Sequence, residues 1–272
     1  MSETIIIDGN AIAASIADTI KKTVVKIGAK PRVTLVSVGS SEVTKSYVKR
    51  KRDFADRVGI DFLEDELLVD ATQAEVIEAV ERANKSSNGV IVQLPLPEHI
   101  DSESVLRAIS IDRDIDVLHP DGSKHGLYGP VAQSVLHIIR MYQLDITRAD
   151  CVVIGNGPLV GKPVRQILEQ YGAKVTTLTK ETPFAEFETA LINAQLVVSG
   201  VGKAGLVQPD HVAQGVVLID AGTSNANGQL QGDIAPECRE KAVLFSPTPG
   251  GIGPITVAKL FENLMVLVAS SQ

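Results

Sequence analysis

The stretch that decides the fold is Cys151-Val-Val-Ile-Gly155-Asn-Gly-Pro-Leu-Val-Gly161-Lys-Pro163. Its apolar start predicts a strand, and a helix is expected over 161–171. A glycine turn between a strand and a helix is where a dinucleotide-binding fold places pyrophosphate, on backbone N–H groups at the helix N-terminus. The G-x-G-x-x-x-G spacing is one residue longer than the usual fingerprint. A tight strand-to-helix connection without a ligand is therefore the alternative interpretation.

The segment after this turn favours the nucleotide interpretation, because the turn opens a strand-helix-strand unit. The second strand, expected over 174–178, runs into Thr179-Lys180. An NAD site usually has a carboxylate there, whereas a cation or hydroxyl accommodates the 2′-phosphate of NADP. Thr179 and Lys180 therefore indicate NADP, while Glu181 stands one residue later and keeps NAD possible.

Strands and helices alternate outward from the glycine turn in both directions, which predicts parallel sheets covered on both faces. The length of 272 residues suggests two domains at about 150 residues each. We expect an α/β fold of two three-layer α/β domains, the C-terminal one a Rossmann dinucleotide-binding fold. The first domain is expected over 1–120, with a C-terminal helix at 255–272 packing back on it, and the second over 121–254.

Composition excludes several classes of protein. A net charge of −7 and a pI near 5.3 argue against nucleic-acid binding. Cys151 and Cys238 give neither metal spacing nor a disulfide framework, so we expect no metal; Cys151 reads as core and Cys238 as a surface or half-buried thiol. No run approaches the ~20 apolar residues of a membrane span. The N-terminus lacks a basic region, so the sequence predicts a cytoplasmic protein.

The segment Ser46–Ile60 carries five cations, which the helical period separates into two groups. At about 100° per residue, Tyr47, Phe54 and Val58 share one apolar arc. Lys51 falls inside that arc, whereas the other cations fall outside it. Two interpretations of Lys51 stay open: a lysine that snorkels to water, or an ammonium in a cleft whose lowered pKa suits acid–base chemistry.

Three other features have both a structural and a functional interpretation. Gln93 ends a buried apolar strand, so its amide is either satisfied in the core or faces a ligand at the strand's C-terminal end. Asp116 lies in a polar loop, where a carboxylate is usually solvated. The segment Pro247–Pro254 is either a rigid linker or a loop whose glycines approach a ligand closely.

Six segments in order resemble the methylenetetrahydrofolate dehydrogenase/methenyltetrahydrofolate cyclohydrolase family over nearly the full length. The two longest and most distinctive are Gly89-Val-Ile-Val-Gln-Leu-Pro-Leu-Pro97 and Thr248-Pro-Gly-Gly-Ile-Gly-Pro-Ile-Thr-Val257. The other four are Tyr47-Val-Lys-Arg-Lys51 with Gly59-Ile60, Arg113-Asp-Ile-Asp116 with His119-Pro120, Val160-Gly-Lys-Pro163, and Val201-Gly202-Lys203.

The resemblance implies a cleft between a folate-binding N-terminal domain and the Rossmann domain, and a homodimer. It implies that 5,10-methylenetetrahydrofolate is oxidised with NADP to 5,10-methenyltetrahydrofolate, which is then hydrolysed to 10-formyltetrahydrofolate. The implied catalytic residues are Lys51, Tyr47, Gln93 and Asp116. The implied substrate-binding residues are Tyr47, Gln93, Leu94, Pro95, Asp116, Pro249, Gly250 and Gly251. The implied cofactor-binding residues are Gly155, Asn156, Gly157, Val160, Gly161, Thr179, Lys180, Gly200, Val201, Gly202, Thr223 and Gly251.

Four departures from the family pattern leave Lys51, Gln93 and Asp116 untouched. Val117 replaces a glycine, and Gly129-Pro-Val-Ala132 replaces Pro-Cys-Thr-Pro. Asn156 replaces an arginine that commonly serves the NADP phosphate, and Thr179-Lys180 replaces His-Ser. A dehydrogenase with weak cyclohydrolase activity and a catalytically silent folate- or nucleotide-binding protein are the alternative functions.

Overall fold

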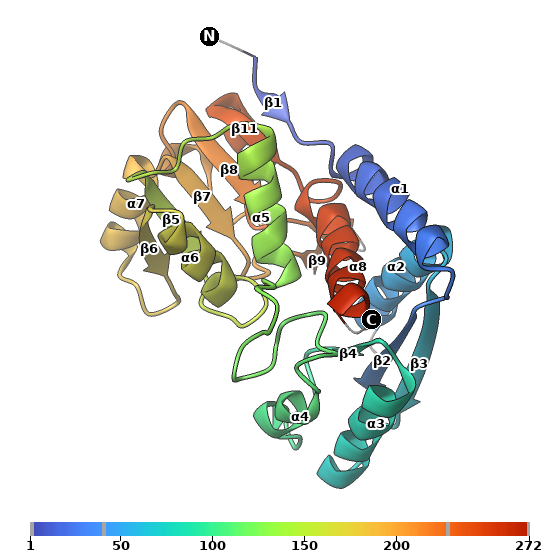
Figure 1. The fold of residues 1–272 in the computed structure, drawn as a ribbon. Coiled ribbons are helices and arrows are strands. Elements are labelled where there is room, and N and C mark those ends of the chain that lie inside the picture. Colours follow the sequence, from blue (N-terminus) through green and yellow to red (C-terminus); the bar gives the residue numbers. More distant parts are fainter. Residues whose placement is uncertain (1–2, 40–41, 227–228, 271–272) are drawn as a thin grey trace. The chain divides into compact units, whose positions relative to one another are not determined.

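The computed structural model describes residues 3–39, 42–226 and 229–270, which form two compact units (Figure 1). We call Ala13–Pro130 with Val257–Gln272 the first unit, and Met1–Ile12 with Val131–Thr256 the second unit. Both are built on parallel strands joined by helices, which confirms the predicted α/β class.

The first unit has a three-stranded parallel sheet in the order β3 (Asp61–Leu67), β2 (Arg32–Val38), β4 (Gly89–Val92). An apolar cluster joins one face of this sheet to α3 (Gln73–Ser86) and α4 (Ser102–Ala108).

The other face of that sheet is covered by helices from both ends of the unit. Phe54 on α2 (Glu42–Val58) stacks on Phe261 of α8 (Ile252–Ser270), with ring centroids 5.2 Å apart. A Cβ on Gly89 of β4 would lie 2.8 Å from the Leu264 side chain of α8. Helix α8 therefore packs against this sheet, and the unit has three layers.

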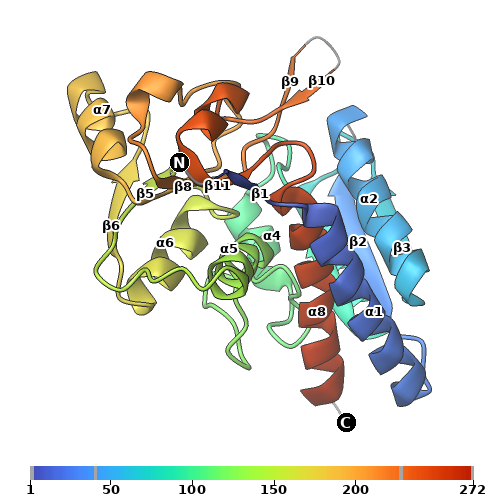
Figure 2. The ribbon, with the colours of Figure 1, turned by 90° about the horizontal axis from the view of Figure 1, so that it is seen from above.

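The second unit has a six-stranded sheet in which every neighbouring pair is parallel. In sheet order its strands are β1 (Ile5–Ile6), β11 (Ala242–Ser246), β8 (Val216–Asp220), β7 (Leu196–Ser199), β5 (Asp150–Ile154) and β6 (Lys174–Leu178). Figures 1 and 2 show α5 (Pro130–Met141) and α6 (Gly161–Gln170) on one face of this sheet and α7 (Phe184–Asn193) on the other.

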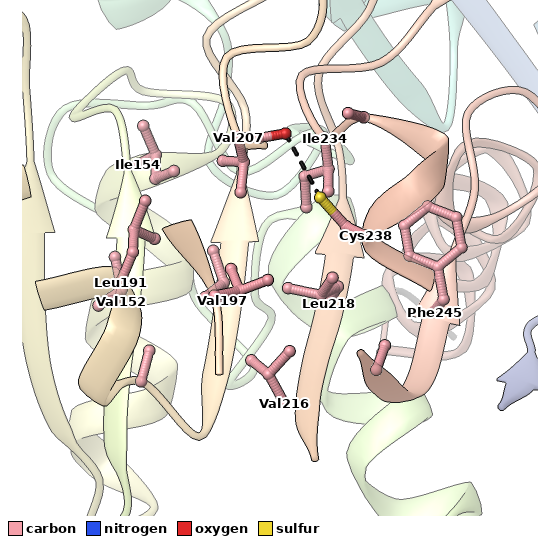
Figure 3. Packing of buried hydrophobic residues seen from close by; sticks show 14 of the residues in the cluster. Val152, Ile154, Leu191, Val197, Val207, Val216, Leu218, Ile234, Cys238 and Phe245 are labelled. Atoms are coloured by element: carbon pink, nitrogen blue, oxygen red, sulfur yellow. Dashed lines mark hydrogen bonds between the residues drawn. The ribbon is translucent and has the colours of Figure 1, made fainter. Parts of the chain in front are cut away.

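The core on the α7 side consists of alternate residues of the strands, because successive side chains of a strand point to opposite faces. Figure 3 shows Val152, Val197 and Leu218 from three adjacent strands packed with Leu191 of α7. The sheet is thus covered on both faces, as expected for parallel strands with near-continuous apolar sequences.

Several expectations need correction. β1 lies beside β11 (Figure 2), with Ile5 paired to Leu244, so the N-terminal residues expected in the first domain belong to the second unit. Cys238 is fully buried, where its thiol donates to the Val207 carbonyl (Figure 3). Cys151 is buried as predicted. Several observed elements were not among those expected: β11, the hairpin of β9 (Ser224–Ala226) and β10 (Gln229–Gln231), and the 3-10 helices at Pro209–His211 and Pro236–Glu240.

Helix α8 is long and apolar enough to cross a membrane by length and composition alone, although Lys259, Glu262 and Asn263 interrupt its apolar sequence. However, 61% of the apolar 18-residue stretch of α8 is buried inside the protein, as in the core helix of a globular fold. The remaining helix, α1 (Gly9–Ile27), begins after Asp8, whose carboxylate accepts the N–H of Ala11 at 3.0 Å.

Candidate active site and nucleotide site

The position of Lys51 follows from the amphipathic sequence of α2. Phe54, Ala55 and Val58 are buried, as the helical arc predicts. The cations outside the arc are all exposed: Lys45, Lys49, Arg50, Arg52 and Arg57. Lys51 is half-buried between these two groups, which confirms that it is turned toward the apolar side.

The Lys51 amine meets two polar groups that come from other parts of the first unit. Its Nζ donates to Oε1 of Gln93 at 3.1 Å. The Gln93 amide is oriented by a second bond, since its Nε2 donates to the Leu94 carbonyl at 2.8 Å. Burial lowers the pKa of Lys51, and the charge of Asp116 partly opposes this effect. Burial likewise raises the pKa of Asp116, and the charge of Lys51 opposes it. The structure thus brings Lys51, Gln93 and Asp116 together.

Asp114, which the sequence analysis did not single out, holds the loop that carries Asp116. Its buried carboxylate accepts backbone N–H groups of Asp116 at 3.2 Å, Val117 at 2.9 Å and His119 at 2.7 Å. The N–H of Leu118 adds a fourth bond at 2.7 Å. One side chain therefore fixes the path of residues 116–119, because each of these donors would otherwise have to find another acceptor.

Val117 has a φ of 58°, in the left-handed region that β-branched residues rarely adopt. Replacement of Val117 by glycine should therefore stabilise the protein by about 1 kcal/mol, since the left-handed conformation costs an L-residue about 1–2 kcal/mol and glycine little. Urea unfolding measures the change. Gln143→Gly, at another positive φ of 53° with an unbranched side chain, is the control and should gain less. A Val117→Gly variant less stable than the unchanged protein would show that this loop is not strained.

Tyr47, Leu94 and Pro95 belong to the same unit as Lys51. Tyr47 precedes Lys51 by about one helical turn on α2 and is half-buried, with the Arg50 guanidinium 5.6 Å from its ring centroid. Leu94 and Pro95 directly follow Gln93 after β4. All the predicted catalytic residues therefore lie in the first unit.

The predicted nucleotide turn lies at the carboxyl edge of the second unit's sheet. From β5 the chain passes to β6 on one side and then returns to β7 on the other, so the strand order reverses at β5. Ligands of open α/β sheets bind outside the carboxyl ends of strands at such a point. Gly155 follows β5 and Gly200 follows β7, which places both predicted residues there.

The glycines at and beside this turn lie where any larger residue would collide with the chain itself. A Cβ on Gly161 would lie 2.1 Å from the Gly155 carbonyl oxygen, and one on Gly200 would lie 2.4 Å from the Val160 side chain. A Cβ on Gly155 would lie 2.7 Å from the Val201 side chain. These glycines therefore let the chain pack closely on itself at the start of α6, while Asn156 and Gly157 of the turn are exposed. This arrangement fits a dinucleotide pyrophosphate.

The end of β6 presents the residues expected to distinguish NADP from NAD. The Lys180 side chain is 91% exposed, and its Nζ lies 3.8 Å from a Glu181 oxygen. The Thr179 hydroxyl donates to the other Glu181 oxygen at 2.7 Å, which contributes most to lowering the pKa of Glu181. The cation and the carboxylate thus lie side by side at this strand end.

The remaining predicted residues of the second unit lie in three turns. A Cβ on Gly202 would lie 3.1 Å from the Thr223 carbonyl oxygen, so these two turns adjoin. Pro249, Gly250 and Gly251 precede α8, and the Gly250 carbonyl accepts the N–H of Gly9 at 2.8 Å. Helix α8 begins at Ile252, three residues before the expected start at 255.

The sequence matches two family descriptions that together span most of the chain. Residues 7–116 match the catalytic domain of tetrahydrofolate dehydrogenase/cyclohydrolase, and residues 130–272 match its NAD(P)-binding domain. The chain belongs to this family. The bifunctional protein FolD of Halothermothrix orenii is 34% identical, and that of Exiguobacterium sp. is 33% identical. The match covers 95% of this chain in both cases, and 95% and 96% of those proteins.

Solved structures of the family have the same fold. The bifunctional FolD enzyme from Campylobacter jejuni superposes with a TM-score of 0.93 at 28% identity, covering 99% of this chain and 100% of that one. The Trypanosoma brucei methylenetetrahydrofolate dehydrogenase-cyclohydrolase, solved with NADP and an inhibitor, gives 0.95 at 29% identity. That match covers 100% of this chain and 99% of the other. The predicted family and fold class are thereby confirmed.

Proposed function

We propose that this protein oxidises 5,10-methylenetetrahydrofolate to 5,10-methenyltetrahydrofolate with NADP, and then hydrolyses the product to 10-formyltetrahydrofolate. The observation that carries this proposal is the Lys51 amine, half-buried, hydrogen-bonded to Gln93 and electrostatically coupled to Asp116. The two similar solved structures are named for both activities, and one of them was solved with NADP. We expect the enzyme to act as a cytoplasmic homodimer.

The oxidation requires mainly positioning from the protein. NADP, when bound, would supply the hydride acceptor. Loss of hydride leaves a cationic methenyl bridge on the folate. The residues proposed to orient the reactants are Tyr47, Leu94, Pro95, Asp116 and the Pro249–Gly251 turn for the folate, and the glycine turns for the cofactor. No strong base is needed, since the bond that breaks delivers its electron pair as hydride.

The hydrolysis requires proton handling, which we assign to Lys51. Water adds to the methenyl carbon and loses one proton to leave a hydroxyl. The bond from that carbon to one ring nitrogen then breaks as the hydroxyl gives up its proton to form the formyl C=O and the nitrogen gains a proton. An amine whose pKa is lowered by burial is more often neutral near pH 7 and can accept the water proton. The Gln93 oxygen holds the amine in place, and Asp116 stabilises its protonated form.

One assay distinguishes the proposed function from its two alternatives. The purified protein is incubated with 5,10-methylenetetrahydrofolate and either NADP or NAD, and the products are measured. We expect NADPH to accumulate together with 10-formyltetrahydrofolate. Accumulation of methenyltetrahydrofolate that decays only at the buffer rate would instead indicate a dehydrogenase alone. Nucleotide or folate binding without any reduced cofactor would identify a silent binding protein and overturn the proposal.

Lys180 is proposed to select NADP through its charge. Lys180→Ala should raise the Kd for NADP by about tenfold, or about 1.4 kcal/mol, and leave the Kd for NAD nearly unchanged. Lys174→Ala, an exposed cation at the opposite end of the same strand, is the control for net charge. Calorimetric titration with each nucleotide checks the result, and an equal loss for both nucleotides would remove Lys180 from phosphate recognition.

A further inference from the structure

Two buried aspartates at the carboxyl edge of the second unit's sheet have no role in the proposed chemistry. Asp220 ends β8 and is 1% exposed, and Asp233 follows β10 and is 0% exposed. Burial raises the pKa of Asp220 to about 7, and the neighbouring Asp233 also raises it. Two enclosed carboxyl groups side by side are costly unless their oxygens are hydrogen-bonded. Their partners therefore indicate what they hold.

Asp220 holds the segment that contains Asp233. Its Oδ1 accepts the backbone N–H of Gly222 at 3.0 Å and that of Asp233 at 3.1 Å, and its Oδ2 accepts the N–H of Ile234 at 3.0 Å. The Ile234 side chain packs in the core beside Val207 (Figure 3). The end of β8 thus fixes a segment 13 or 14 residues further along the chain.

Asp233 in turn holds the segment that follows β7. Its Oδ2 accepts the Ser199 hydroxyl and the N–H of Val201, both at 2.7 Å. Its Oδ1 accepts the N–H of Lys203, also at 2.7 Å. All three donors belong to residues 199–203, so one carboxylate sets the shape of this turn.

Two glycines make room for these carboxyl groups. A Cβ on Gly222 would lie 2.0 Å from the Asp233 carboxyl carbon, and a Cβ on Gly232 would lie 1.9 Å from Oδ2 of Asp220. Neither position tolerates a larger residue while the aspartates keep their places. Glycine at both positions is therefore required for the two carboxyl groups to pack where they do.

The turn held by Asp233 borders the proposed nucleotide site. The Val201 side chain would be 2.7 Å from a Cβ on Gly155, and Gly200 packs directly on Val160. We propose that Asp220 and Asp233 are positioning residues for the nucleotide, acting in series to set the 199–203 turn against the glycine turn. This inference rests on the proposed function, because it assumes that the edge binds NADP.

The test compares Asp233→Asn with Asp210→Asn, a control whose side chain is 85% exposed in the same unit. Both Asp233 oxygens accept hydrogen bonds, so an amide in either orientation turns its NH₂ group toward a donor. We expect the Kd for NADP and the KM for NADP to rise by about tenfold or more. The rate of methenyltetrahydrofolate hydrolysis should stay unchanged, since Lys51, Gln93 and Asp116, which are proposed to handle its protons, lie in the first unit. Unchanged NADP affinity in folded Asp233→Asn would overturn the inference.

Ser199→Ala is a second, milder variant that removes one donor without creating a mismatched pair. It should raise the Kd for NADP by about threefold and leave hydrolysis unchanged. If circular dichroism shows that Asp233→Asn does not fold, Ser199→Ala decides: a wild-type Kd overturns the inference, and a selective loss supports it. If the unchanged protein does not bind NADP, the proposed function itself fails, which distinguishes the two failures.

Discussion

Lys51→Met is expected to lower the rate of methenyltetrahydrofolate hydrolysis by about 10³-fold, or about 4 kcal/mol, which is within the range for loss of a general acid–base group. The variant keeps the length and apolar character of the stem but has no amine to accept the water proton. NADP should still bind with its normal Kd, because the glycine turn lies in the second unit. Loss of methenyltetrahydrofolate absorbance measures the hydrolysis directly.

Lys49→Met provides a matched control on the same helix. The Lys49 side chain is 69% exposed and pairs with Asp53 at 2.6 Å, so its loss should leave the hydrolysis rate nearly unchanged. Hydrolysis by Lys51→Met at the rate of the unchanged protein would remove this lysine from the mechanism. A similar loss in both variants would assign the effect to the positive charge of the helix.

Gly161→Ala should weaken NADP binding strongly, raising the Kd by about 100-fold or more, or about 2.7 kcal/mol. The added Cβ would lie 2.1 Å from the Gly155 carbonyl oxygen and 2.8 Å from the Asn156 Cα, so the start of α6 must move away from the turn. Such overpacking also destabilises a fold by about 1–3 kcal/mol. Calorimetric titration with NADP and thermal unfolding check the two effects.

Gly157→Ala is the comparison for the stability effect. A Cβ on Gly157 meets no atom within 4 Å, so this variant should unfold at the normal temperature. Hydrolysis should persist in Gly161→Ala, since Lys51, Gln93 and Asp116, which are proposed to handle its protons, lie in the first unit. Normal NADP affinity in Gly161→Ala would contradict the assignment of this turn to pyrophosphate.

The helical arc around Lys51 could be predicted from sequence because α2 buries one continuous face and exposes the rest. Apolar runs such as Cys151–Ile154 likewise predict buried parallel strands. The pairing of β1 with β11 could not be predicted, because the two short strands lie more than 230 residues apart and carry no local signal. The same holds for β11 itself, a short apolar segment before the Pro/Gly-rich turn.

The roles of three buried aspartates could not be predicted from the sequence either. Asp114, Asp220 and Asp233 each accept at least three hydrogen bonds, but most of their partners are backbone N–H groups, which every residue except proline possesses. Asp233 meets donors 30 to 34 residues earlier in the chain. Only the position of Asp220 at the end of an apolar strand gave a usable signal, because side chains at strand ends border ligand sites in such folds.

The central claim, that one chain both oxidises and hydrolyses its folate, is tested most directly by adding methenyltetrahydrofolate to the unchanged protein without nucleotide. We predict that its absorbance disappears faster than in buffer, in proportion to protein concentration, and that 10-formyltetrahydrofolate appears in equal amount. Decay at the buffer rate, by a protein that still reduces NADP with methylenetetrahydrofolate, would contradict the claim.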